Sequence, residues 1–119
     1  MVNEKLNEVA EGDIDLMIEL LEIYFSQESK AKKEMLELAS SNDWQRIAKI
    51  SHRFQPSVVY VGLASVSEKL KLLENIIIEK HSEEAIQKLF FSMIEDLAKA
   101  RAELHDGYEK LVRQRNHKP

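Results

Sequence analysis

The stretch WQRIAKISHRFQPSVVYVG, residues 44–62, contains the pattern that decides the fold. Its apolar and small side chains recur in steps of three and four, which is the spacing of one face of an α-helix. The positions of this seam are Trp44, Ile47, Ser51, Phe54, Val58 and Val61. Gly62 then ends the helix, because glycine readily takes the left-handed backbone conformation at a helix C-terminus. One apolar seam cannot be buried by its own helix, so this segment requires helical partners.

The preceding segment repeats the same periodicity. A long helix is predicted over residues 13–40, with Asp13 as its N-cap and Glu28 as the one polar residue in its apolar stripe. Asn42, followed three residues later by Gln45, resembles a capping box that begins the next helix.

The following segments supply two more helices. A third stripe runs over residues 63–77, and Ser82 can cap a last helix whose stripe runs over residues 86–111. The three joins between the helices are only a few residues long, which forces consecutive helices to lie antiparallel. The sequence therefore predicts an all-α protein, an antiparallel up-down-up-down four-helix bundle.

The two ends of the chain extend the predicted bundle. Residues 2–10 are expected to add a short N-terminal helix, with Leu6 and Val9 packing across one end of the bundle. The 119 residues form a single domain, 1–119, with its core at about 12–112. The basic tail, residues 113–119, is expected to fray.

Composition excludes several classes of protein. Glycine and proline together number only five, which argues against an all-β fold. The absence of cysteine excludes disulfide frameworks, thiolate zinc sites and cysteine nucleophiles. No apolar run approaches the ~18 residues of a membrane span, and the polar N-terminus does not resemble a signal peptide. We therefore expect a soluble cytoplasmic protein without a membrane partner.

Charge is unevenly distributed. The net charge of −4 argues against a nucleic-acid partner. Residues 43–57, however, contain Arg46, Lys49 and Arg53 against Asp43 alone. Such a local basic stretch on an acidic chain indicates either an anionic partner surface or a plain solvated helix face.

Motifs of enzymes and metal sites are absent from the sequence. There is no glycine-rich phosphate loop and no G-x-S-x-G or H-E-x-x-H motif. None of the four histidines has a glutamate three residues before it, so the di-iron pattern of helical bundles is missing. We predict no metal site and no cofactor.

His52 is the residue with the clearest chemical potential. A helix turns ~100° per residue, which places His52 one step off the seam through Ser51 and Phe54 and therefore near the surface. An exposed neutral imidazole is a competent nucleophile, and neighbouring cations such as Lys49 and Arg53 would attract a phosphoryl group. The alternative is a surface histidine with no role.

Pro56 lies four residues after His52, where it removes the amide that would bond to the His52 carbonyl. A kink is expected at this point. Because the seam continues in phase through Val58 and Val61, a kinked but continuous helix is favoured over a break.

These residues resemble the signature of the histidine-containing phosphotransfer (HPt) family. The resemblance is carried by ISHRFQPS, residues 50–57, with Gly62 ten positions after His52. It extends to residues 16–25, to Asn42-Asp43-Trp44 and to residues 70–74, and covers roughly residues 12–112. Two positions depart from the family pattern, since Gln55 replaces the usual lysine and Pro56 the usual glycine.

The resemblance implies a phosphorelay intermediate without an ATP site, hence a phosphocarrier and not an enzyme. His52 would accept a phosphoryl group from a receiver-domain aspartate and pass it to another one. The partners would be receiver domains of response regulators or hybrid histidine kinases, which would supply Mg²⁺, and the chain is expected to be monomeric. The alternatives are an HPt-like module that binds receivers without phosphorylation, and a purely structural helical bundle.

The resemblance and the helical phase together predict which residues around His52 contact the phosphoryl group or a partner. The predicted neighbours of the phosphoryl group are Gln55, Lys49, Arg53, Pro56 and Ser57. The predicted partner-binding residues are Ala48, Val59, Val9 and Leu6, although core packing is the favoured interpretation of Val59.

Overall fold

The computed structural model describes residues 4–117, and that range consists of helices joined by short turns and contains no strand. Five helices follow one another, α1 (Glu4–Val9), α2 (Ile14–Ser40), α3 (Trp44–Tyr60), α4 (Ala64–Ile78) and α5 (Glu83–Asn116). The predicted all-α class is confirmed for this range.

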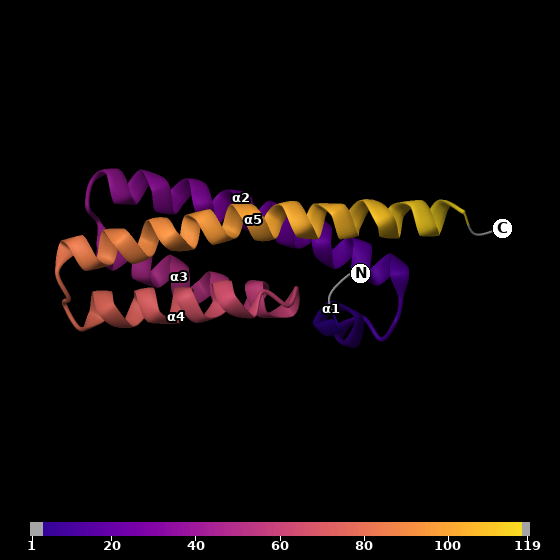
Figure 1. The fold of residues 1–119 in the computed structure, drawn as a ribbon, viewed down its shortest axis with the longest axis horizontal. Coiled ribbons are helices and arrows are strands. Elements are labelled where there is room, and N and C mark those ends of the chain that lie inside the picture. Colours follow the sequence, from indigo (N-terminus) through magenta and orange to yellow (C-terminus); the bar gives the residue numbers. More distant parts are fainter. Residues whose placement is uncertain (1–3, 118–119) are drawn as a thin grey trace.

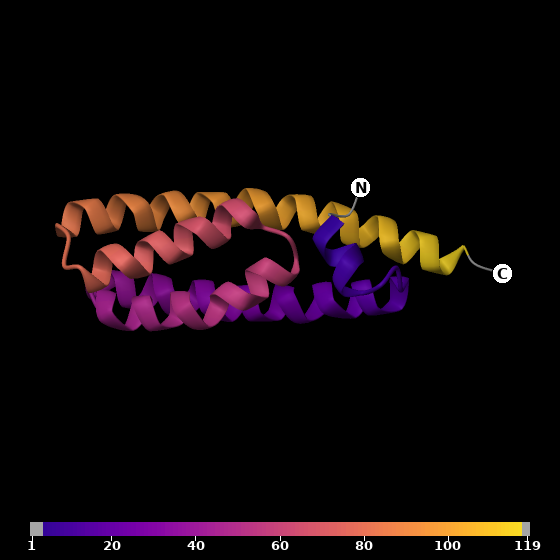
Figure 2. The same cartoon turned by 90° about the horizontal axis from the view of Figure 1, so that it is seen from below.

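Helices α2 to α5 lie side by side along the long axis of the molecule, which measures 57 Å (Figures 1 and 2). Helix α3 packs on α2 and α4, and α5 packs on the same two helices. Their apolar stripes meet in one core, and each of the four helices contributes side chains with almost no exposed surface. These include Leu21, Tyr24, Met35, Ile47, Leu70, Leu73, Ile77, Phe90, Met93 and Leu97.

Helix α1 fills one end of this group. At 1.5 Å per residue α3 and α4 are roughly 26 and 22 Å long, against about 40 and 51 Å for α2 and α5. Helix α1 lies beyond the shorter pair and contacts α3 (Figure 2). Leu6 is fully buried there and Val9 is partly buried, so the predicted packing of this segment at one end is confirmed.

One predicted helix boundary was wrong by one residue. The cap of α3 is Asp43 and not Asn42, because the Arg46 amide donates to Asp43 Oδ1 at 3.3 Å while Asn42 sits in the turn with a φ of 57°. Helix α5 continues to Asn116, into the tail for which fraying is predicted, and the His117 amide donates to the Arg113 carbonyl at 3.1 Å. Residues 118 and 119 of the predicted tail lie outside the described residues.

Glu28, the polar residue in the stripe of α2, is buried, and its carboxylate has two partners. Its carboxylate accepts a hydrogen bond from the Tyr24 hydroxyl at 3.1 Å and another from the Arg101 guanidinium of α5. Arg101 also donates to the Phe25 carbonyl and lies 5.0 Å from the centre of the Phe25 ring. Burial, together with the adjacent Glu28 charge, raises the pKa of the Tyr24 phenol far above its usual value. This cluster joins α2 to α5 without leaving a buried polar group unpaired.

Candidate functional site

His52 stands on the outer face of α3. The seam beside it faces inward, with Ser51 fully buried and Phe54 stacked on Tyr24 at a ring separation of 6.0 Å. The His52 side chain is 72% exposed, as the helical phase predicted. Helix α3 runs through Pro56 to Tyr60 without a break, so the predicted continuity of this helix is confirmed.

A carboxylate of α4 holds one nitrogen of the ring. His52 Nδ1 lies 3.1 Å from Glu74 Oε2, and the Glu74 side chain is 21% exposed. A carboxylate can only accept a hydrogen bond, so the proton of the neutral ring sits on Nδ1. Nε2, at the outer end of the imidazole, then carries the free lone pair. The arrangement gives an exposed nucleophile with a defined tautomer.

The imidazole lies in an open hollow of about 540 Å³ between α3 and α4. Residues of different chemistry line it, and they are Gln45, Ala48, Lys49, His52, Arg53, Glu74 and Ile78. The hollow therefore brings His52 together with both cations that the sequence nominated.

Lys49 and Arg53 also border the opposite side of α3. Both line a hollow between α2 and α3 together with Arg46, Glu34 and Glu37. Among residues 4–117, Arg46 is paired with Asp43 at 3.5 Å, whereas Lys49 and Arg53 have no carboxylate within 4.0 Å. Two cations that are not held in a close ion pair thus lie beside the His52 ring, although Glu34 and Glu37 border the same second hollow.

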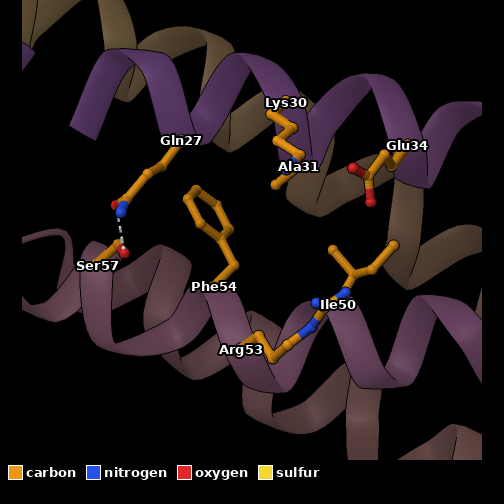
Figure 3. Close-up of a pocket in the computed structure, with 8 residues that line it drawn as sticks. All are labelled: Gln27, Lys30, Ala31, Glu34, Ile50, Arg53, Phe54 and Ser57. Atoms are coloured by element: carbon orange, nitrogen blue, oxygen red, sulfur yellow. Dashed lines mark hydrogen bonds between the residues drawn. The ribbon is translucent and has the colours of Figure 1, made fainter. Parts of the chain in front are cut away.

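Ser57 faces away from the His52 hollow. It lines a groove of about 240 Å³ between α2 and α3, where its hydroxyl donates to Gln27 Oε1 at 2.6 Å (Figure 3). Gln55 and Pro56 do not line the His52 hollow either. Of the five predicted neighbours of the phosphoryl group, the structure brings Lys49 and Arg53 into the hollow and leaves the other three outside it.

The predicted partner-binding residues differ widely in exposure. Leu6 is fully buried and Ala48 is 6% exposed. Both belong to the core, so the prediction that they form a docking surface was wrong. Val9 is partly buried. Val59 is 41% exposed, and the interpretation of this residue as a core side chain was therefore wrong. Ile78, which borders the hollow and is 59% exposed, was not predicted.

Glu74 was also missed as a neighbour of His52, although the sequence carries a signal for it. The turn between α3 and α4 is centred near Leu63, and His52 and Glu74 are each eleven residues from that position. Because both helices rise by the same amount per residue, positions equidistant from the turn lie at the same level. This symmetry also pairs Ala48 with Ile78, which border the same hollow.

Other kinds of site find no support in the described part of the chain. Within residues 4–117 no three histidine or acidic side chains converge as a metal site requires. Over the same range, none of the helices combines the length and the apolar character needed to cross a bilayer.

Comparison with models of known families, with curated proteins and with solved structures found no match to this chain.

Proposed function

We propose that this protein is an HPt-type phosphocarrier in two-component signalling. His52 accepts a phosphoryl group from a receiver-domain aspartate and passes it to another receiver. The observation that carries the proposal is the exposed His52 ring whose Nδ1 is held by Glu74 at 3.1 Å, which leaves Nε2 free for attack.

On this chain the transfer requires first an oriented nucleophile. The Nε2 lone pair attacks the phosphorus of the aspartyl phosphate in line, the Nε2–P bond forms, and the P–O bond to the aspartate breaks so that a carboxylate leaves. The proton on Nδ1 stays in the hydrogen bond to Glu74, which stabilises the positive charge that develops on the ring. The reverse steps pass the group to a second receiver, and Mg²⁺ comes from the receiver. No ATP site is implied, so the chain is a carrier and not an enzyme.

The proposed architecture is an antiparallel up-down-up-down four-helix bundle formed by α2 to α5. Short turns near residues 41, 62 and 81 support this arrangement, since they reverse the chain between consecutive helices. The bundle is proposed to act as a cytoplasmic monomer whose partners are receiver domains of response regulators or hybrid histidine kinases.

The decisive experiment is incubation with a ³²P-phosphorylated receiver domain. The wild-type protein is expected to acquire an acid-labile, base-stable label, and His52→Gln is expected to acquire none. His81→Gln is the matched control, because His81 is also exposed but lies in the turn between α4 and α5, and it should label normally.

The same experiment separates the rival functions. A wild-type protein that binds the receiver but takes no label would be an inactive HPt-like module, as Gln55 and Pro56 would suggest. A protein that neither binds nor takes label would be a structural bundle.

A further inference from the structure

We infer that Lys49 and Arg53 form the binding site for the phosphoryl group on His52, on the side of the ring that faces α2. This inference rests on the proposed function of His52. It assigns anion binding to Lys49, one turn before the histidine, and to Arg53, the residue after it. Gln55 has no part in this binding.

Helical phase places both cations on the same side of His52. With ~100° per residue, Lys49 lies ~60° and Arg53 ~100° around α3 from His52 in one direction, whereas Gln55 lies ~60° in the other. Arg53 also borders the groove between α2 and α3, which fixes that direction as the side of α2 (Figure 3). Glu74 approaches the ring from α4. The ring therefore stands between a carboxylate at Nδ1 and two cations on the opposite side.

Charge favours a dianion at this position. A phosphoryl group carries about −1.5 to −2 at neutral pH and presents three acceptor oxygens. Lys49 and Arg53 are exposed and have no carboxylate within 4.0 Å in the described chain, so their donors are available. The planar guanidinium of arginine can donate two parallel hydrogen bonds to a phosphate, and the lysine ammonium adds a mobile point charge.

The test uses phosphoramidate, a small phosphodonor that needs no receiver. Nε2 attacks its phosphorus, the P–N bond breaks and ammonia leaves as the Nε2–P bond forms. We expect Lys49→Gln and Arg53→Gln each to slow phosphorylation of His52 roughly tenfold, which corresponds to about 1.4 kcal/mol of lost transition-state stabilisation.

Lys30→Gln is the matched control. Lys30 borders the groove between α2 and α3 but not the His52 hollow, and its substitution changes the net charge by the same amount. We expect its rate to stay within about twofold of wild type, with far-ultraviolet circular dichroism confirming that all three variants are folded.

Two results would overturn the inference while leaving the proposed function intact. One is an unchanged rate in both Lys49→Gln and Arg53→Gln. The other is an equal slowing in all three variants, which would indicate general attraction of the anion and no local site. If the wild-type protein takes no label on His52 from either phosphoramidate or a receiver, the proposed function itself fails and the inference with it.

Discussion

The imidazole of His52 combines exposure with a fixed orientation, because its side chain is 72% exposed while Glu74 holds Nδ1 at 3.1 Å. A free surface histidine exchanges between two tautomers, and only one of them leaves Nε2 unprotonated. Glu74 selects that tautomer through its bond to Nδ1, although it need not touch a phosphoryl group. Glu74 is thus a positioning residue whose contribution is measurable apart from the fold.

Substitution of Glu74 by alanine is expected to slow phosphoryl transfer to His52 roughly fivefold, because the Nδ1–H tautomer is no longer favoured. The measurements are the rate of labelling and the ¹⁵N chemical shifts of the ring, which report the tautomer directly. Glu68→Ala, an exposed acidic position on the same helix, serves as the control and should change neither. An unaltered tautomer in Glu74→Ala would contradict the assignment.

At this scale helical phase predicted the direction of His52, whereas the positions taken from the motif and the partner of the ring were predicted poorly. The outward direction of His52 follows from its phase relative to Ser51 and Phe54, since a helix fixes that angle. The contact with Glu74 depends on which residues of α3 and α4 lie at the same level. The apolar stripes alone do not give this register, which follows only when the position of the turn is known. Ser57 was predicted beside the phosphoryl group for a related reason. Motif spacing does not show that its hydroxyl donates to Gln27 of α2.

The seam between α2 and α5 shows how one element tolerates a charge in its apolar stripe. Glu28 is 2% exposed and meets both the Tyr24 hydroxyl and the Arg101 guanidinium. An isolated buried carboxylate costs several kcal/mol, so its retention depends on Arg101. The Arg101 side chain is 41% exposed, and solvent offsets part of that dependence.

Arg101→Met is expected to lower the free energy of unfolding by about 2–3 kcal/mol, because it leaves the Glu28 charge unpaired. The double variant Glu28→Met with Arg101→Met should recover part of this loss, since it removes the unpaired charge but leaves the buried Tyr24 hydroxyl without its acceptor. Urea unfolding of both variants measures the difference. Equal losses in the single and double variants would show that packing and not charge accounts for the effect.

The N-terminal boundary of a helix was predictable to within one residue where a side chain accepts a hydrogen bond from an amide of the first turn. Asp13 and Ser82 cap α2 and α5 as expected, with their side-chain oxygens accepting from Leu16 and Ala85. Asn42 and Asp43 are both good cap residues, and periodicity alone did not separate them. The positive φ of Asn42 decides the matter, because a left-handed residue belongs to the turn.

The whole molecule should show a characteristic loss of stability at high pH. The pKa of Tyr24 is raised in the folded state, chiefly by burial, whereas the unfolded chain ionises near pH ~10. The unfolded state therefore releases the proton first. The stabilisation that the protonated Tyr24 phenol gives to the folded state is complete below pH ~10. Above that pH the free energy of unfolding falls by about 1.4 kcal/mol per pH unit.

Urea midpoints measured between pH ~9 and ~11.5 test this dependence. Tyr24→Phe removes the ionisable group and should flatten the decline. A slope identical to that of the wild-type protein would mean that another group controls alkaline unfolding. Tyr108, whose pKa is raised first by its hydrogen bond to Glu22, would be the next candidate.

Glu74 occupies one ring nitrogen of His52, and a consequence for timing follows under the proposed function. A single acceptor atom remains, so a delivering domain and a receiving domain cannot engage it together. The two domains must bind one after the other, so dissociation of the first domain limits the overall rate of transfer. A donor domain that stays bound after the transfer would block the second domain and would stop the relay just as the absence of a donor would.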